Sequence, residues 1–346
     1  MTTDSPAGLP APMDPRALHR EIAAFARSST GRSLFELAVT AIPFLGLLFG
    51  MWVLFAIGFW TAIVLCVPAG ALLVRLFMIQ HDCGHGSFFR SRAANDWVGR
   101  VIGIFTFTPY DYFKRSHALH HATTGNLDKR GMGDVATLTL NEYRALPLRK
   151  RLAYRLYRNP LILFGFGPAF LFLFQFRLPL GLMRKGWKPW ASTMSTNVFI
   201  GGAIALMIVF LGWMVFVLLY LPVLIVAATA GVWLFYVQHQ FEGAVWDRDE
   251  DWNFHQSALH GSSHYALPQP LRWISANIGM HHVHHLSSRI PFYNLPKVLR
   301  ARPELHQVSR LTLWQSLSAV RLKLWCEETR RLVGFSEAKK AASANA

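Results

Sequence analysis

Two long stretches with almost no charged side chains constrain the fold of this chain more than any other feature. The first runs from Ser33 to Gln80 and contains only Glu36 and Arg75 as charged residues. The second has no Asp, Glu, Lys or Arg between Lys188 and Glu242. A helix of about 20 apolar residues crosses a bilayer, so each stretch has room for two crossings. We therefore predict an all-α integral membrane protein with four transmembrane helices arranged as two hairpins.

The composition supports this prediction and excludes other classes. Hydrophobic residues make up 52% of the chain and charged residues 16%, against about a quarter charged in soluble proteins. The net charge is +16, but the basic residues flank the apolar stretches and form no nucleic-acid-binding motif, so a membrane surface is the expected partner and nucleic acid is not. The first thirty residues lack the apolar centre of a secretory signal. Three widely spaced cysteines argue against a disulfide framework and against a cysteine-based metal site.

Turn signals and basic flanks predict the topology. The first hairpin is expected to turn around Ala56 to Gly58. The second is expected to turn at Tyr220-Leu221-Pro222, because proline disfavours helix interiors. The spans then fall at about 34–54, 58–79, 197–217 and 219–238. Basic residues at the outer ends of both hairpins place these ends and both termini on the cytoplasmic side of the membrane.

Two further apolar stretches, Trp97 to Tyr112 and Leu161 to Phe176, are too short to cross. We expect both to dip into the cytoplasmic leaflet; the alternative is a buried core helix. The predicted organisation is a cytosolic segment 1–32, a membrane domain 33–300 and a basic cytosolic C-terminal tail 301–346. A helical cap, 80–196 and 239–300, is expected to hold a di-metal site. The last residues, from Ser336 on, are expected to be disordered.

Histidines are the second unusual feature, because 15 are present and eight form three tight groups. Residues three and four apart share one face of a helix, so each group directs two or three imidazoles at one point. This spacing predicts metal ligands; the alternative is a solvated, pH-responsive face. The predicted topology brings the three groups to the same side of the membrane. Their members are His81, His85; His117, His120, His121; and His281, His284, His285.

Eight imidazoles exceed the three or four that one ion takes, so two metal ions are predicted. Imidazole binds iron, zinc, copper and nickel alike, so the spacing does not name the element. His239, at the end of the second hairpin, is a candidate ninth ligand; the alternative is a hydrogen bond to the backbone. Carboxylates commonly orient metal-bound histidines, and the candidates for this role are Asp82, Asp128 and Asp134.

The remaining histidines are not predicted to bind metal. Three of them, His255, His260 and His264, lack ligand spacing and are expected around the site or on the surface. On a helix, His282 points away from its neighbours. Surface positions are expected for His19 and His306.

Together, these motifs resemble those of the membrane-bound fatty acid desaturase family, bacterial acyl-lipid type. The resemblance rests on the first box His81 to His85, the second box at 117–121 continuing as ATTGNLDKRGMGD, and the third box HHVHHLSSRIPFYNL. It extends over residues 35 to 300. Some relatives have four residues between the first two histidines, whereas this chain has three, as the acyl-lipid and omega-type relatives do. The resemblance therefore favours a lipid-linked acyl chain over an acyl-CoA thioester.

The resemblance implies a non-haem di-iron centre held by all nine histidines, with Asn277 at a water-mediated position. It also implies that O2 is used to insert a double bond into a fatty acyl chain. A redox-active metal fits such chemistry and zinc does not. The chain has no iron–sulfur, haem or flavin motif, so electrons are expected from a separate ferredoxin or b-type cytochrome with its reductase. The two short apolar stretches are the expected walls of the substrate slot.

Two alternatives remain open from sequence. The same site could serve hydroxylation, epoxidation or oxidative decarboxylation of an acyl or alkyl chain. A membrane metal transporter or sensor would use the histidines without catalysis. The transporter predicts ligands within the bilayer, whereas the middles of the apolar stretches contain no His, Asp or Glu.

Overall fold

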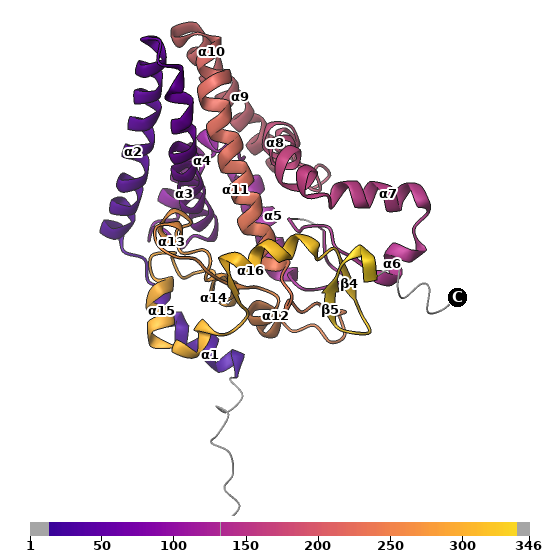
Figure 1. The fold of residues 1–346 in the computed structure, drawn as a ribbon. Helices are drawn as coiled ribbons and strands as arrows, with labels where there is room; N and C mark the ends of the chain where they lie inside the picture. Colours follow the sequence, from indigo (N-terminus) through magenta and orange to yellow (C-terminus); the bar gives the residue numbers. More distant parts are fainter. Residues whose placement is uncertain (1–13, 132, 338–346) are drawn as a thin grey trace, which may run out of the picture.

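The computed structural model describes residues 14–131 and 133–337, and it is mostly helical (Figure 1). Four of its helical segments are long and apolar enough to cross a membrane: Thr30–Ala56, Trp60–His85, Trp187–Leu211 and Trp213–His239. They stand side by side in the upper part of Figure 1, above the elements that follow the fourth segment. The first segment is α2 (Thr30–Ala56), and the second contains α3 (Cys66–His85). The third is α9 (Trp187–Leu211), and the fourth contains α10 (Trp213–Val215) and α11 (Leu221–His239).

The break between the first two segments lies where it was predicted, because α2 ends at Ala56 and Gly58 has a φ of +89°. The break between the other two lies earlier than predicted, at Gly212, whose φ of +90° suits glycine. Pro222 does not interrupt the fourth segment. It lies in the first turn of α11, directly after a π-helical turn at Phe216–Tyr220, and such a turn accommodates the hydrogen bond that proline cannot donate.

Shorter elements build the rest of the molecule. Between the second and third long segments lie α4 (Arg92–Phe105), α5 (Tyr110–Thr123), β1 (Leu138–Thr139), α6 (Leu140–Ala145), α7 (Leu148–Tyr157) and α8 (Gly167–Leu173). After the fourth come α12 (Phe254–His260), β2 (His264–Ala266), α13 (Leu271–Ile274), α14 (His281–Leu286) and α15 (Leu295–Ala301). The N-terminal α1 (Pro15–Ile22) packs against α12. The helical stretches Leu148–Tyr157 and Leu161–Arg177 are bent by 57° relative to each other.

Two small sheets modify the all-α prediction, and both use the C-terminal segment that was predicted to be a tail. This segment contains β3 (Arg310–Thr312), α16 (Leu313–Ser318), β4 (Leu324–Cys326) and β5 (Arg331–Val333). The strand orders are β1-β4-β5 and β2-β3. Leu305 and Trp325 are almost fully buried, so apolar side chains fold this basic segment onto the molecule. The predicted disorder from Ser336 on falls largely outside the described residues.

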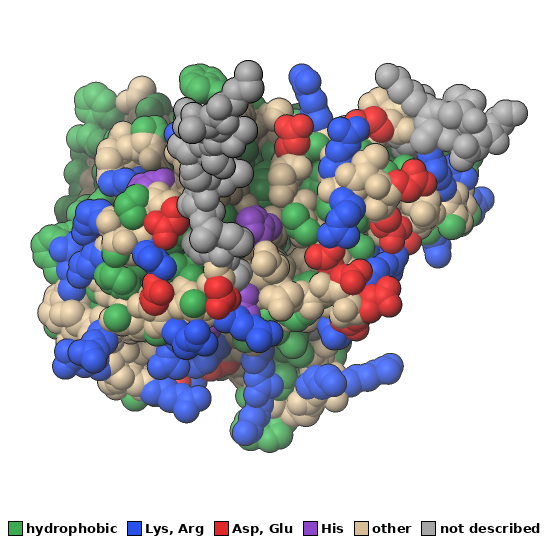
Figure 2. Space-filling model, turned by 90° about the horizontal axis from the view of Figure 1, so that it is seen from below, with side chains coloured by type: hydrophobic (Ala, Val, Ile, Leu, Met, Phe, Trp, Pro, Cys, Tyr) green, Lys and Arg blue, Asp and Glu red, His purple; other side chains and the backbone are tan. Residues whose placement is uncertain are grey.

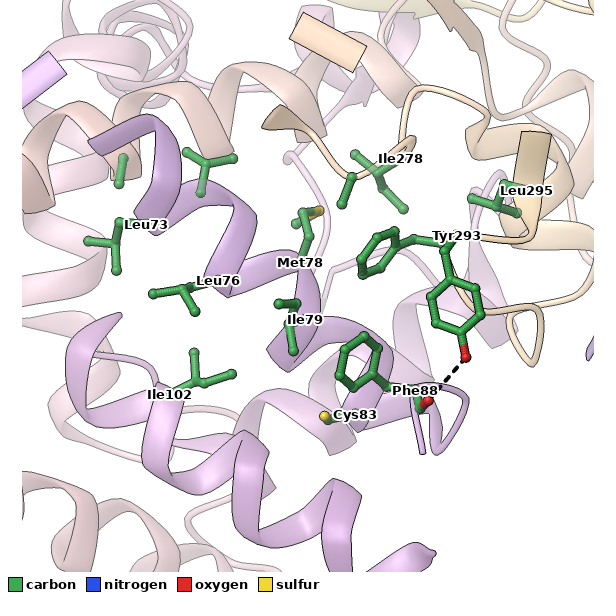
Figure 3. Close-up of a cluster of buried hydrophobic side chains, with 14 of the residues drawn as sticks. Leu73, Leu76, Met78, Ile79, Cys83, Phe88, Ile102, Ile278, Tyr293 and Leu295 are labelled. Atoms are coloured by element: carbon green, nitrogen blue, oxygen red, sulfur yellow. Dashed lines mark hydrogen bonds between the residues drawn. The ribbon is translucent and has the colours of Figure 1, made fainter. Parts of the chain in front are cut away.

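An apolar core joins the first pair of long segments to the elements below it (Figure 3). Leu73, Leu76 and Ile79 of α3 meet Ile102 of α4, and residues after the third histidine group complete the cluster. A buried ion pair lies beside it, with Arg75 Nη2 2.5 Å from Glu36 Oε2. Arg75 also donates to the carbonyl of Trp273. These contacts fix the lower end of α3, and therefore the position of the first histidine group.

Candidate metal centre

Four helices bring the nine predicted histidines together. The last turns of α3 carry His81 and His85, and α11 ends at His239. The other six lie on α5 and on α14, a helix of six residues. Their imidazole nitrogens form two clusters, and within each cluster the ligand atoms lie within 4.8 Å of one another. The first cluster is His81, His85, His117, His121 and His284; the second is His120, His239, His281 and His285.

The spacing of the Nε2 atoms fits metal coordination. In the first cluster His121 Nε2 lies 3.1 Å from His117 Nε2 and 3.1 Å from His284 Nε2. In the second, His239 Nε2 lies 3.1 Å from His120 Nε2 and 3.0 Å from that of His281. Ligands about 2.1 Å from one ion are about 3.0 to 3.4 Å apart at octahedral or tetrahedral angles. The clusters therefore have the dimensions of two coordination shells.

Adjacent histidines in the chain serve different clusters. His120 belongs to the second cluster and His121 to the first; His284 belongs to the first and His285 to the second. Neighbouring helical residues point about 100° apart, so one H-x-x-H-H motif reaches two points at once. The rings of His121 and His285 stack with their centroids 4.0 Å apart. The two ion positions thus lie next to each other and share two helices.

Hydrogen bonds on the outer nitrogen fix three of these rings. His120 Nδ1 lies 2.5 Å from Asp134 Oδ1, and His81 Nδ1 lies 3.1 Å from Asp82 Oδ1. His239 Nδ1 donates to the carbonyl of Gly261 at 3.1 Å. With Nδ1 holding the proton, each Nε2 lone pair faces its cluster, as a metal ligand requires. His239 therefore makes the backbone hydrogen bond that was the alternative to ligation and still belongs to the cluster.

Asp82 also links two of the histidine groups. Its Oδ2 accepts a hydrogen bond of 2.7 Å from the backbone nitrogen of Phe292, which follows the third group. Because Oδ1 of the same carboxylate bonds His81, Asp82 connects the first and third groups.

Burial keeps at least five of the clustered imidazoles neutral. It lowers the pKa of His117, His121, His281, His284 and His285 well below 6.5, and neighbouring histidines lower it further. Burial raises the pKa of Asp134, but the hydrogen bond and charge of His120, together with the hydrogen bond from the backbone of Gly131 and the charge of His239, leave this pKa below its usual value. The centre therefore offers neutral nitrogen donors beside an ionised carboxylate, a combination that favours a cation over protons.

Asp128, one of the three predicted orienting carboxylates, forms no hydrogen bond with a clustered histidine, and the water-mediated position of Asn277 stays a prediction. Asp128 forms an ion pair with Arg248 at 2.6 Å and accepts from the backbone nitrogen of Asp249. Asn277 donates to the carbonyl of Phe292 at 3.2 Å and has a φ of +57°, so its contacts stabilise a turn. Both lie near the histidine groups in sequence, but the chain turns their side chains to other partners.

The other histidines lie outside both clusters. His282 bonds the carbonyl of Leu305, and His264 bonds that of His306. His260 and His306 are exposed, as predicted for His306, whereas His19 is half-buried against His255.

Sequence reasoning missed some residues that hold the imidazoles. The ring of Phe113 stacks on His117 with centroids 5.1 Å apart, and Phe235 lies 5.0 Å from His120. Phe113 precedes His117 by one helical turn, and Phe235 precedes His239 by one turn. This i, i+4 spacing of a phenylalanine and a histidine could have been recognised in the sequence. The Gly261 carbonyl could not have been found, because every residue except proline offers the same backbone groups and only the tertiary fold selects this one.

A comparison with family models matches residues 58–316 to the fatty acid desaturase model. The chain belongs to the fatty acid desaturase family. This desaturase is similar to a fatty acid desaturase of Bacillus subtilis strain 168, with 41% identity over 324 residues, which cover 94% of this chain and 92% of that protein. As a member of this family it is an oxidoreductase that introduces double bonds into fatty acyl chains, which favours the leading prediction over transport or sensing.

Two further relatives carry more specific names. The sn-1 acyl-lipid omega-3 desaturase (ferredoxin) of Synechocystis is 31% identical over 71% of this chain and 70% of its own length. The acyl-lipid omega-3 desaturase (cytochrome b5) of the Arabidopsis thaliana endoplasmic reticulum is 27% identical over 77% of this chain and 68% of its own length.

Proposed function

We propose that this desaturase inserts a cis double bond into an acyl chain of a membrane lipid, using O2 and two iron ions at the histidine clusters on the cytoplasmic side. The observation that carries this proposal is the pair of adjacent clusters, with five and four histidines. Iron bound there would supply the oxidising power that removal of hydrogen from an unactivated chain requires. A single structural zinc site would need only four of these ligands.

The chain's own residues would position the metal ions and keep their ligands neutral. His81, His85, His117, His121 and His284 would hold one ion; His120, His239, His281 and His285 would hold the other. Asp134 and the Gly261 carbonyl would keep the proton of His120 and His239 on Nδ1. The partly buried rings of Phe113 and Phe235, beside His117 and His120, would limit water around the ligands.

An apolar groove provides a place for an acyl chain close to this centre. It has a volume of about 460 Å³ and lies between α2, α3 and α4. Trp97 and Phe105 line it, which agrees with the prediction that the stretch from Trp97 walls the substrate slot; Leu161 to Phe176 is not part of its lining. Leu76 in the groove precedes His81 by five residues, about 8 Å along a helix axis. We propose that the groove receives part of the substrate chain.

The proposed topology is two hairpins with the metal centre and both termini on the cytoplasmic side. The first and second histidine groups follow the first hairpin, and the third follows the second hairpin. A shared centre requires an even number of crossings between the second and third groups. This supports a bent stretch from Leu148 to Arg177 that stays on one side, leaving four spans.

The lipid and the electron donor are inferred from the relatives and the surface. Three residues separate the first two histidines, as in the acyl-lipid relatives, which supports a lipid-linked chain over acyl-CoA. The relatives are named for ferredoxin and for cytochrome b5, and we propose a donor of one of these kinds. The face opposite the loops of the long segments is rich in Lys and Arg around a hollow where histidines are visible (Figure 2). Such a face attracts anionic lipid and an acidic donor.

The deciding experiment is expression in a host that supplies electrons, followed by fatty acid profiling with gas chromatography and mass spectrometry. We expect new cis double bonds and about two iron ions per chain. His120→Ala should abolish the product while the protein still inserts into the membrane. Hydroxy acids or terminal alkenes without new unsaturation would instead support the other reactions of the same site, and zinc with no O2 consumption would contradict the iron assignment.

A further inference from the structure

A second pocket lies beside the segment that carries the third histidine group. It has a volume of about 320 Å³, and Gly279 and Met280, which line it, directly precede His281. None of the nine clustered histidines lines this pocket. It therefore differs from both the metal centre and the apolar groove.

The lining is basic and contains no carboxylate. Arg272, Arg310, His264 and His306 contribute to it, and no Asp or Glu does. Within the described part of the chain neither arginine forms an ion pair. Burial is the main cause of the lowered pKa of His264, and the charges of His306, Arg310 and Arg272 lower it further. Two unneutralised guanidinium groups that line the same concave site attract an anion.

Neutral contacts orient this lining without cancelling its charge. In the amide orientation of Gln269 that satisfies both its oxygen and its nitrogen, the oxygen accepts hydrogen bonds from Arg272 Nε at 3.1 Å and Nη2 at 2.8 Å. His264, with only 6% of its surface exposed, bonds the carbonyl of His306 at 2.9 Å. The register of β2 and β3 pairs His264 with Arg310. Arginine presents its donors in a planar fork that matches phosphate oxygens, so phosphate is the anion that this arrangement fits best.

The side chains of α13 support a position of the pocket near the membrane surface. Leu271 and Trp273, on either side of Arg272, are each 39% exposed. Trp273 also packs under the guanidinium of Arg75, 4.1 Å from its ring centre, on the membrane-spanning α3. Exposed tryptophan and leucine beside an arginine are typical of the interface between lipid tails and headgroups. A phosphate that reaches this pocket is therefore most readily carried by a lipid.

We propose that Arg272 and Arg310 bind the phosphate of a phospholipid headgroup. This inference deepens the proposed function and rests on it for the identity of the lipid as substrate. This contact with the headgroup lies away from the acyl chain. It would let the desaturase discriminate phospholipids from lipids without phosphate.

Binding of dihexanoyl-phosphatidylglycerol to the purified, iron-loaded protein in a non-ionic detergent tests the proposal without turnover. Calorimetry should show saturable binding to the wild-type protein and at least tenfold weaker binding to Arg272→Gln/Arg310→Gln. The control Arg149→Gln/Arg331→Gln removes the same charge from two exposed positions outside the pocket and should bind like wild type. Arg272→Lys/Arg310→Lys retains the charge and should bind with intermediate affinity, which distinguishes lost recognition from misfolding.

Two further probes identify the ligand. Dihexanoylglycerol, which has the same chains and no phosphate, should not compete; inorganic phosphate should compete only at much higher concentration. Equal affinity for the double glutamine variant and wild type would overturn the site. Equal competition by inorganic phosphate and by the phospholipid would overturn the lipid assignment. Neither result depends on activity, so failure of this inference is distinguishable from failure of the proposed desaturation.

Discussion

Asp134 and Asp128 show how two carboxylates six residues apart acquire different roles. Asp134 is buried beside His120, whereas Asp128 forms a partly exposed ion pair with Arg248. We expect Asp134→Asn to lower iron affinity and desaturation about 10- to 100-fold, because carboxylates that orient metal-bound histidines typically contribute this much. Asp128→Asn should change both by no more than about twofold, since exposed ion pairs contribute little. Iron titration and product yield provide the measurements, and equal effects of the two variants would contradict the assigned roles.

The sequence predicted the histidines better than their partners. Helical spacing within each box identified all eight boxed residues, because i, i+3 and i, i+4 positions share a face. The choice between Asp128 and Asp134 depends on how the loop after α5 folds against Arg248 and Gly131. Composition and spacing do not encode that path, so all three candidate aspartates looked alike.

The buried neutral imidazoles predict that the folding stability of the metal-free protein depends on pH. Burial holds the pKa of His281 and His285 well below 6.5 in the folded state. Below pH 6.5 the unfolded chain therefore binds more protons, and folding stability falls as pH falls. The expected loss is about 1.4 kcal/mol per pH unit for each histidine that stays neutral. Urea unfolding of chelator-treated protein between pH 5.5 and 8 should be flat above pH 7 and decline below 6.5. A flat profile throughout would contradict the burial of neutral rings.

Close packing of α3 against α11 holds two of the histidine-bearing helices at a fixed distance. A Cβ at Gly70 would lie 2.6 Å from Val226 Cγ1 and 3.1 Å from the Val223 carbonyl. We expect Gly70→Ala to push the two helices apart, lowering the melting temperature by several degrees and reducing iron content. At Gly231, on α11, a Cβ would meet no atom within 4 Å, so Gly231→Ala should be neutral or slightly stabilising. A thermal melt and an iron assay of both variants test this prediction.

Two tryptophans of the C-terminal segment differ strongly in exposure. Trp325 of β4 is 1% exposed and Trp314 of α16 is 79% exposed. Trp325→Ala should cost about 3 to 5 kcal/mol of folding free energy, as buried aromatic truncations do, and Trp314→Ala no more than about 0.5 kcal/mol. Denaturant titration of both proteins checks this. Similar losses would show that the C-terminal segment is the loose tail predicted from its charge.

The positions of the long helices could be predicted from the sequence, but those of the short strands could not. Long uncharged stretches identified the four candidate spans, because length and hydropathy are what a bilayer selects. The turn at Gly58 was predicted, but the one at Gly212 was not, since Pro222 gave the stronger sequence signal and a π-helical turn accommodates it. The strands of two or three residues gave no usable signal; β1 and β4 pair across a large separation in sequence.

The whole molecule must satisfy one topological condition, because a shared metal centre needs all three histidine groups on one side. The bent stretch between α7 and Arg177 decides whether the condition holds, since as one crossing it would make five spans. Single cysteines at Ala145 and Lys185, both exposed, lie on either side of it. If this stretch does not cross, both should react with a membrane-impermeant maleimide only after the membrane is permeabilised.

Cysteines in the two turns serve as the matched controls. Phe59→Cys and Trp213→Cys replace exposed residues at the far ends of the hairpins and should react in intact cells. Cys66, which is partly exposed, is replaced by serine in the background protein, while Cys83 and Cys326 are buried. Labelling of Ala145→Cys and Lys185→Cys from opposite sides would mean that the stretch crosses. The third histidine group would then be separated from the other two by the bilayer, which is incompatible with the clusters that His121 and His284 form together.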